Sequence, residues 1–219
     1  MNKFFLGLLL VLSVPLAAPL VSAADNLTAG TDYEMVVPPL PGETDGKAEV
    51  IEFFWYGCPH CSHFEPSVRS WAANLPDNIH FVRVPAVFNN PTWKLHAQAF
   101  YTAEVLGIMD KFHPAMFAAW HEQKRHLITE DQLQAFFAEL GVSEEDFRKT
   151  FNSFAVQTKV RRAADLTKRS GIDGVPTIMV NGKFRVNGTL AGSYERMLSI
   201  TEDLAKMEAK SQAVAKSPD

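Results

Sequence analysis

The chain contains two cysteines, Cys58 and Cys61, and they flank the dipeptide Pro59-His60. Two cysteines three residues apart at the junction of a strand and a helix can form a dithiol-disulfide redox pair. As a structural crosslink the pair would close a very short loop and contribute only about 2 kcal/mol to stability. The spacing therefore predicts a pair that reacts rather than one that stabilises.

The position of Cys58 predicts a reactive thiolate. Pro59 follows it, and proline is well tolerated in the first turn of a helix. Unpaired backbone N–H groups and the positive end of the helix dipole favour an anion there, and His60 could add a hydrogen bond or a positive charge. We expect a lowered pKa for Cys58 and a more buried, resolving Cys61. A stabilised thiolate stabilises the reduced form, which makes the disulfide an oxidant.

A central strand and a helix must position this pair. Residues 48–56 are nearly all apolar, which is typical of a strand covered on both faces, and Gly57 interrupts the pattern. A helix is expected from Pro59 towards Asn74, with Pro66 as a candidate kink. Further strands are predicted over residues 33–37, 79–84, 177–180 and 183–186.

The long segment between Pro91 and about Ser170 predicts helices and no strand, because its apolar residues recur at helical spacing. After it, Asn181-Gly182 is typical of a tight hairpin turn. The order β, β, α, β, helices, β-hairpin, α contains the units of a thioredoxin fold, an α/β fold, with an inserted all-helical domain. Helix boundaries are expected at Gly107, Gly141, Ser143 and Ser193.

This order predicts a discontinuous redox domain. It comprises residues 24–90 and 157–210, and the inserted helical domain comprises residues 91–156. The tail, residues 211–219, is rich in Ala, Lys and Ser and is expected to fray.

The N-terminus predicts export. Lys3, an apolar stretch and small residues up to Ala23 are typical of a signal peptide over residues 1–23 that is cleaved after Ala23. An uncleaved membrane anchor is the alternative, although the apolar segment barely reaches a spanning length. Without Lys3, 20 basic residues face 25 acidic ones, a net charge near −5, which argues against binding to nucleic acid.

Two further features are candidates for the site. Gly174-Val175-Pro176-Thr177 opens a strand, where proline is confined to the first position, an edge or a bulge. Because only about 5–6% of X-Pro bonds are cis, these residues alone favour a trans bond. Glu52 is an acid inside the apolar strand, so it needs a partner or a raised pKa unless it faces solvent at an edge.

Several motifs together resemble the DsbA family of periplasmic thiol:disulfide oxidoreductases. The resemblance extends from the strand near Tyr33 through the final helix and includes a helical insertion of suitable size. A C-P-H-C motif with a downstream V-P is a specific combination, whereas a single C-x-x-C is not. The matching motifs are Phe53-Phe54 before Cys-Pro-His-Cys, Phe64-Glu65, Gly174-Val175-Pro176 and Val180-Asn181-Gly182-Lys183.

The resemblance implies a nucleophilic Cys58, a resolving Cys61 and a cis Val175-Pro176 bond that exposes the Val175 backbone to a substrate. It also implies that Glu52 helps to move protons to and from the buried cysteine, and that Arg83 on the neighbouring strand pairs with it.

The activity that the resemblance implies is the oxidation of exported, partly unfolded proteins through a mixed disulfide. A quinone-linked inner-membrane partner of the DsbB type would re-oxidise the protein in the periplasm, where disulfides persist. No bound cofactor is expected, and the default expectation is a monomer.

Other interpretations remain open. His63 with the cysteine pair could suggest a zinc cluster, but the ligands are too compressed for the usual sets. A disulfide isomerase or reductase shares the motif type, although dimeric isomerases carry an N-terminal dimerisation domain for which too few residues precede the redox strand. A chaperone-like binding module with a structural pair is the non-enzymatic alternative. The remaining histidines are interpreted as surface or satisfied interior residues: His80, His96, His113, His121 and His126.

Overall fold

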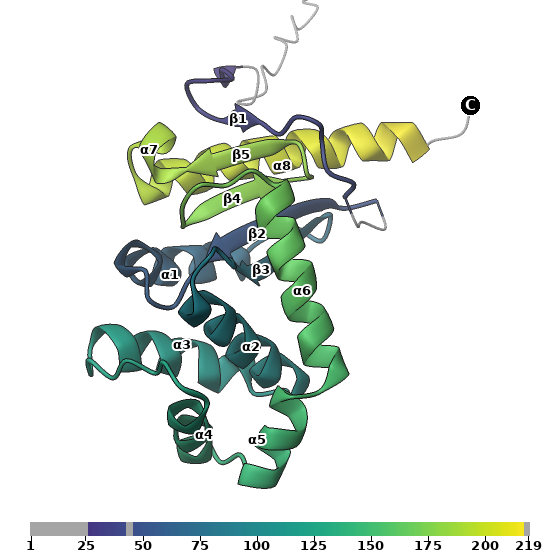
Figure 1. Cartoon of the computed structure of the whole chain (residues 1–219). Coiled ribbons are helices and arrows are strands. Elements are labelled where there is room, and N and C mark those ends of the chain that lie inside the picture. The colour runs from purple at the N-terminus through teal and green to yellow at the C-terminus, as the bar shows by residue number, and fades with distance from the viewer. Residues whose placement is uncertain (1–25, 43–45, 217–219) are drawn as a thin grey trace, which may run out of the picture.

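The computed structural model describes residues 26–42 and 46–216. The predicted signal peptide, residues 1–23, lies outside these ranges. In the described part of the chain, five strands form one mixed sheet in the order β1-β5-β4-β2-β3 (Figure 1). No helix within it combines the length and the apolar composition needed to cross a bilayer.

The central strand, β2 (Ala48–Phe54), leads to the cysteines. It pairs in parallel with β3 (Ile79–Pro85) and antiparallel with β4 (Thr177–Val180). β4 turns back into β5 (Phe184–Asn187), and β1 (Glu34–Met35) pairs antiparallel with β5 at the far edge. The predicted strands are confirmed, and the first of them is shorter than expected.

The turn between β4 and β5 confirms the Asn181-Gly182 hairpin. Both residues have left-handed φ angles, 51° and 67°, as a tight two-residue turn requires. A Cβ on Gly182 would lie 2.3 Å from the carbonyl oxygen of Leu40, so the close approach of the backbones also requires glycine. Antiparallel pairing then sets Thr177 opposite Phe53, which brings the start of β4 to the end of β2.

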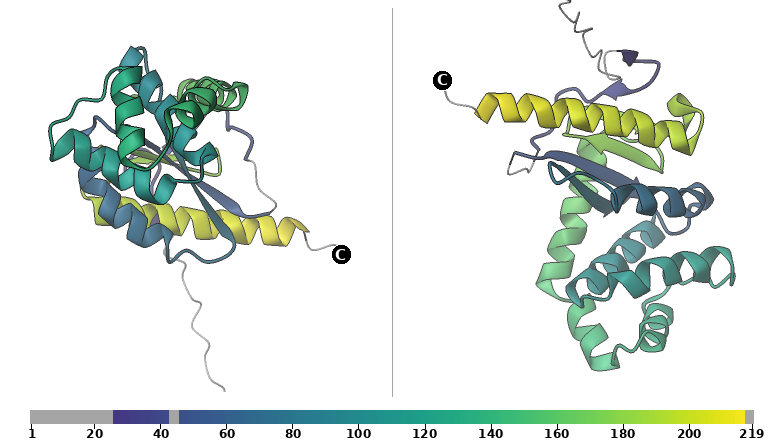
Figure 2. Two further views of the ribbon diagram at one scale, coloured as in Figure 1. Left: turned by 90° about the horizontal axis from the view of Figure 1, so that it is seen from below. Right: turned by 180° about the vertical axis from the view of Figure 1, so that it is seen from behind.

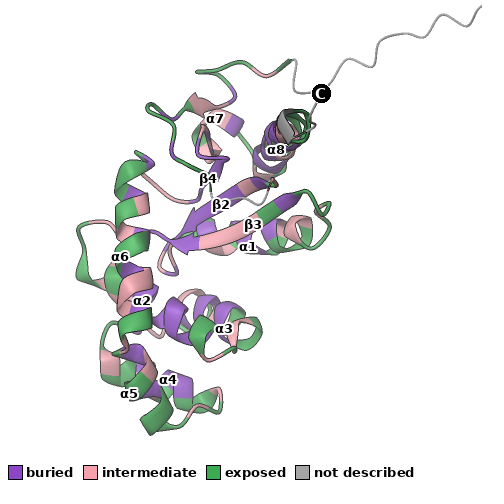
Figure 3. Cartoon of the chain, turned by 90° about the vertical axis from the view of Figure 1, so that its right-hand side faces the viewer, coloured by how far each residue is buried: buried purple, intermediate pink, exposed green. Residues whose placement is uncertain are grey.

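Helices cover both faces of the sheet. α1 (Pro59–Ala72) and α8 (Tyr194–Lys216) pack on one face (Figure 2), where the core includes Val50 and Ile178. On the other face Ile51 belongs to a core that is continuous with the inserted helices. Because successive strand residues point to opposite faces, both faces of β2 are buried (Figure 3).

The insertion forms a cluster of helices beside the sheet, as predicted. It contains α2 (Pro91–Val105), α3 (Met109–His121), α4 (Glu130–Glu139) and α5 (Glu144–Phe151). α6 (Phe154–Arg169) then returns the chain to the sheet (Figure 1).

The predicted helix boundaries are confirmed by their geometry. Gly107 and Gly141 have φ angles of 69° and 91° just beyond α2 and α4, a conformation that favours glycine. Ser143 Oγ accepts a hydrogen bond from the Asp146 N–H at 3.0 Å, and Ser193 Oγ accepts one from the Arg196 N–H at 3.1 Å. The boundary between residues 156 and 157 falls inside α6, and the division into domains stays a prediction.

The structure also differs from the sequence-based expectation. A short helix, α7 (Gly188–Ala191), was not predicted, because four residues are too few to show helical periodicity. α8 includes residues 211–216 of the tail, since Ala, Gln and Lys are good helix formers, and the fraying of this tail stays a prediction. The Val175-Pro176 bond is cis, as the resemblance implies and against the expectation from the residues alone, and Val37-Pro38 is also cis.

Candidate functional site

The two cysteines lie at the N-terminus of α1, as predicted. Cys58 is the N-cap residue with an extended backbone (φ −85°, ψ 117°), and its Sγ accepts a hydrogen bond from the Cys61 N–H at 3.4 Å. Both side chains are free thiols. Cys58 is 9% exposed and Cys61 1% exposed, so the first sulfur is the one that another molecule can reach.

The environment separates the pKa values of the two thiols. Hydrogen bonding from the Cys61 side chain and from the Cys61 and His60 backbone N–H groups, with the His60 charge, lowers the pKa of Cys58 to about 6 despite partial burial. Burial, followed by its interactions with Cys58, raises the pKa of Cys61 well above its ordinary value. Near neutral pH Cys58 is therefore a thiolate and Cys61 a thiol, and the Cys61 S–H donates a hydrogen bond to the Cys58 thiolate.

His60 acts on Cys58 less through its ring than the sequence suggests. Its charge is the smallest of the causes that lower the Cys58 pKa, and its backbone N–H contributes more. The ring is exposed and lies beside Tyr194, whose OH is 3.5 Å from His60 Nδ1 and donates to the His60 carbonyl oxygen at 3.1 Å. The backbone N–H groups of the helix terminus thus stabilise the Cys58 thiolate more than the His60 ring does.

The loop before β4 lies against the redox pair. When it is protonated, Cys58 Sγ–H donates to the Val175 carbonyl oxygen at 3.4 Å, and Thr177 Oγ1 donates to the Gly174 carbonyl oxygen at 2.8 Å. A hollow of about 700 Å³ extends from this loop, with Pro176 and Tyr194 among its lining residues. The arrangement leaves an open surface beside the accessible sulfur.

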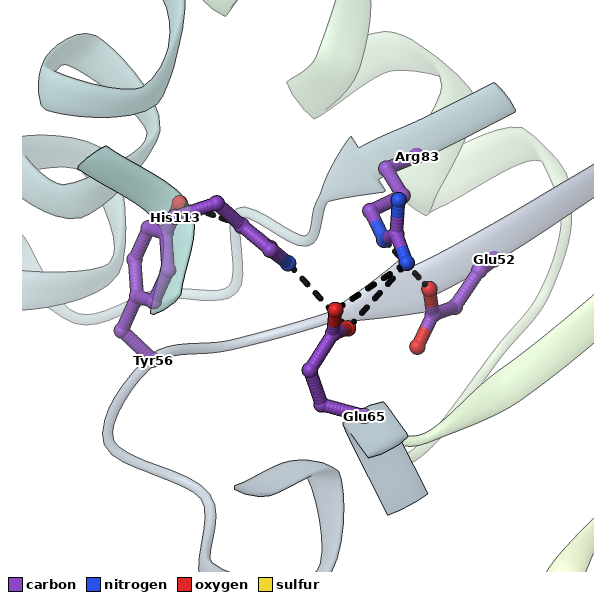
Figure 4. A network of polar contacts seen from close by, with 5 residues as sticks. All are labelled: Glu52, Tyr56, Glu65, Arg83 and His113. Carbon is purple, nitrogen blue, oxygen red and sulfur yellow. Dashed lines mark hydrogen bonds and ion pairs between the residues drawn. The ribbon is translucent and has the colours of Figure 1, made fainter. Parts of the chain in front are cut away.

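Glu52 and Arg83 contact each other, and Glu52 is close enough to the pair for its charge to raise the pKa of Cys61. They are register neighbours on β2 and β3, and Arg83 Nε is 3.2 Å from Glu52 Oε2 (Figure 4). Glu52 is 1% exposed, so the alternative of a solvated edge position is wrong. Burial raises the pKa of Glu52 to about 7, against the lowering effect of Arg83.

A second carboxylate competes for the same guanidinium. Arg83 donates from one terminal nitrogen to both oxygens of Glu65, each at 3.2 Å, whereas neither Arg83 Nε nor Glu52 Oε2 forms a hydrogen bond. The charge of Glu65 also raises the pKa of Glu52. Glu52 is therefore a buried acid with incomplete compensation, which is the condition for titration near neutral pH.

His113 and Tyr56 extend this network into the inserted helices (Figure 4). His113 Nε2–H donates to Glu65 Oε2 at 3.2 Å, and Tyr56 OH donates to His113 Nδ1 at 2.8 Å. Burial lowers the pKa of His113, which fits a neutral ring with this pair of bonds. Burial also raises the pKa of Glu65, but its hydrogen bond with His113 and the nearby charges hold it below the ordinary value.

These partners were not found from the sequence. Glu65 follows Cys61 by four residues, so helical spacing could have placed it on the same side of α1. His113 offered no such signal, because only the packing of α3 against α1 brings its ring to Glu65. His121, also on α3, is a further contact between the insertion and the site, since its Nε2–H donates to the Tyr56 carbonyl oxygen at 2.8 Å.

The site contains the groups that thiol-disulfide exchange requires: an accessible sulfur with a low pKa, a buried partner and an ionisable acid whose charge acts on that partner. No group of three or more His, Cys, Asp or Glu side chains among the residues described is arranged to hold a metal ion. The site residues predicted from the sequence are therefore brought together at one end of the sheet.

Comparison with known proteins is consistent with this chemistry. The family described as "DSBA-like thioredoxin domain" matches residues 49–195. The thiol:disulfide interchange protein DsbA of Pseudomonas syringae pv. tomato is 40% identical over 194 residues, which cover 89% of this chain and 90% of the relative. That of Burkholderia cepacia is 41% identical over 199 residues, covering 90% and 93%. The crystal structure of Pseudomonas aeruginosa DsbA is 41% identical with a TM-score of 0.81, covering 89% of this chain and 99% of that one.

The Cys58 pKa gives a first prediction. Ultraviolet absorbance of the thiolate in the reduced protein should titrate with a midpoint near pH 6. Cys61→Ala should raise this midpoint more than His60→Ala does, because the Cys61 side chain is the largest cause of the shift and the His60 charge the smallest. A larger effect of His60→Ala would contradict the dominance of the helix N-terminus and the neighbouring thiol.

Glu52 gives a second prediction, in the stability of the protein. Its pKa is raised from 4.5 to about 7 in the folded state, so the folded protein holds a proton that the unfolded chain releases. Relative to Glu52→Gln, the wild type should lose about 3 kcal/mol of unfolding free energy as the pH rises from below 4.5 through 7. Urea unfolding of the reduced proteins across this range measures the difference.

Glu139→Gln is the matched control. Glu139 is the last residue of α4 and forms an ion pair with Arg125, and both side chains are exposed, unlike that of Glu52. It should leave the fall in stability between these pH values nearly unchanged. Parallel curves for the wild type and Glu52→Gln would show that folding leaves the pKa of Glu52 unchanged, which would contradict the prediction.

Proposed function

Because this chain belongs to the DsbA family of thiol:disulfide interchange proteins, we propose that it donates its Cys58-Cys61 disulfide to exported proteins through a mixed-disulfide intermediate. The chain is a protein disulfide oxidoreductase with a thioredoxin fold and a helical insertion. The observation that carries the proposed direction of transfer is the position of Cys58 as the N-cap of α1, where its Sγ accepts a hydrogen bond from the Cys61 N–H at 3.4 Å and its pKa is lowered.

The first step of the proposed mechanism is attack by a substrate thiolate on Cys58 Sγ. A bond forms between the two sulfurs, the Cys58-Cys61 bond breaks, and Cys61 leaves with the electron pair. The raised pKa of Cys61 means that its sulfur takes a proton at once. We assign this proton to Glu52, whose pKa of about 7 allows both protonation states near neutral pH, with Arg83 as the group that holds it in place.

In the second step another substrate thiolate attacks the substrate sulfur that is bonded to Cys58. Cys58 leaves as a stabilised thiolate, and the substrate gains a disulfide while the protein becomes the dithiol. Because a leaving group with a low pKa departs faster, the same hydrogen bonds that stabilise the thiolate also favour release. Pro59 fixes the first turn of α1, and the Val175 backbone beside Pro176 is the proposed contact for an extended substrate.

The partners and the compartment are part of the proposal. The substrates are unfolded or partly folded proteins with free cysteines, and a quinone-linked inner-membrane oxidase of the DsbB type restores the disulfide. The signal-like pattern of residues 1–23 supports export to the periplasm. No nucleic acid takes part, and the protein is expected to act as a monomer without a bound cofactor.

Two other functions make different predictions. An isomerase or reductase would act with its cysteines reduced, and a chaperone-like module would not need them. The separated pKa values of Cys58 and Cys61 favour the oxidase, since the reduced form is the one that they stabilise.

Substitution of the resolving cysteine tests the mechanism. Cys61→Ser should accumulate a mixed disulfide with an unfolded substrate whose one cysteine is activated as a disulfide with a good leaving thiol. The Cys58 thiolate attacks the substrate sulfur and the leaving thiol departs, and the attack by Cys61 that would release Cys58 is lost. Mass spectrometry under non-reducing conditions should place the bond on Cys58, and Cys58→Ser should form none. Formation of the mixed disulfide on Cys61 in the Cys58→Ser variant, at a rate equal to or above that of Cys61→Ser, would contradict the roles assigned to the two cysteines.

The direction of transfer is tested by equilibrium with a glutathione redox buffer, followed by thiol trapping. We expect the mature protein to remain reduced until the buffer is strongly oxidising. The double variant Cys58→Ser/Cys61→Ser, which has no thiol, provides the unreactive reference for the trapping signal. A pair that stays oxidised in reducing buffers would instead indicate a reductase-type or structural disulfide.

A further inference from the structure

We propose that a hollow on the helical side of Cys58 binds an aromatic side chain of the substrate, close in sequence to the reacting cysteine. The hollow measures about 460 Å³ and is lined by Cys58, Val175 and three half-buried aromatic rings: Trp55, Phe88 and Trp93. It lies across the Val175 loop from the larger hollow beside Pro176. This inference rests on the proposed function and adds a substrate preference to it.

Gly57 makes room for one wall of the hollow. A Cβ on Gly57 would lie 2.4 Å from Cη2 and Cζ2 of the Trp55 indole, which is far inside van der Waals contact. The indole thus lies across the backbone of the residue that precedes Cys58. Because Gly57 does not have a positive φ, its role is to provide space rather than an unusual backbone conformation.

Three separate segments supply the rings. Trp55 follows β2, Phe88 lies between β3 and α2, and Trp93 lies on α2. The Trp55 and Trp93 rings stack with centroids 4.3 Å apart and planes 10° apart, and Phe88 meets Trp93 edge-on at 4.9 Å and 84°. Stacking fixes the position of the rings without burying them fully, so part of their apolar surface remains available to another molecule.

The position of the hollow identifies its occupant. Cys58 and Val175 line it, so it is continuous with the surface on which a substrate sulfur reacts. An extended polypeptide advances about 3.3 Å per residue with alternating side chains. A side chain one or two residues from the reacting cysteine can therefore reach the hollow while its backbone lies beside Val175.

The chemistry of the lining favours an aromatic group. The rings offer faces and edges for the offset and edge-to-face contacts that aromatic side chains form. Asp173 is the one charged residue among the described residues that line the hollow, and it disfavours an acidic occupant. Aromatic side chains are exposed in unfolded chains and largely buried in folded ones, so the hollow distinguishes a substrate before folding from its product.

Two peptides test this preference. Each carries two cysteines on a flexible spacer, and they differ only in having Phe or Ala beside the first cysteine. We expect the oxidised wild type to be reduced roughly fivefold faster by the Phe peptide, a factor within the range of one aromatic contact. Acid quenching and thiol labelling measure the rates. Trp93→Ala should bring the ratio close to one.

Matched variants separate the contact from other effects. Phe88→Ala should also reduce the ratio of the two peptide rates. Because this variant leaves the Trp55-Trp93 stack in place, it tests the hollow even if Trp93→Ala does not fold. Phe154→Ala removes an aromatic ring that is 81% exposed on α6, and it should keep the wild-type ratio. Glutathione has no aromatic group, so Phe154→Ala should oxidise it at the wild-type rate. The rates of Trp93→Ala and Phe88→Ala with glutathione normalise their rates with the two peptides.

A wild-type ratio near one would overturn the inference, as would a ratio that survives both Trp93→Ala and Phe88→Ala. Occupation of the hollow by a second copy of the chain would also overturn it, and would appear as a dimer in ultracentrifugation at assay concentration. Failure of the oxidised wild type to oxidise either peptide or glutathione would contradict the proposed function itself, irrespective of the hollow.

Discussion

The stabilisation of one sulfur anion at the N-terminus of α1 is the interaction on which the rest of this structure depends. It requires a helix that begins immediately after the central strand, with a residue at the N-cap that can accept backbone N–H bonds. Pro59 meets the first condition, and Cys58 takes the place of the Ser or Asp that commonly caps a helix. An anion-binding helix terminus thus serves as a redox centre.

A buried thiol beside that anion creates a need for proton transfer in a region without solvent. In the mechanism that we propose, Glu52 supplies this proton, because its charge is only partly balanced. Arg83 is hydrogen-bonded to Glu65 and contacts Glu52 through charge alone. The hydrogen bonds from Tyr56 to His113 and from His113 to Glu65 hold Glu65 in position, so that Arg83 keeps its hydrogen bonds with Glu65 rather than with Glu52. A fully paired Glu52 would be a permanent anion, and an unpaired one would remain protonated.

The sequence predicted those parts of the site whose determinants are local. The cysteine spacing, the apolar strand and Pro59 together place Cys58 at a helix start, and Asn181-Gly182 identifies the hairpin that returns the chain to the sheet. The cis state of Val175-Pro176 depended on resemblance, because residues alone favour trans. Other parts of the site could not be predicted, because they depend on how the inserted helices pack against the redox unit, and spacing along the sequence does not predict that packing. These parts are His113, His121 and the Trp55-Trp93 stack.

The hydrogen bond between Cys58 and the Val175 carbonyl joins residues that are 117 positions apart. The helical insertion accounts for most of that separation, so the order in which the chain is synthesised matters. Because synthesis proceeds from the N-terminus, Cys58 and Cys61 emerge long before the loop and strand that complete their surroundings. A partly synthesised chain has the two thiols without the Val175 loop beside them. Maturation of this catalyst is therefore tied to completion of its own chain.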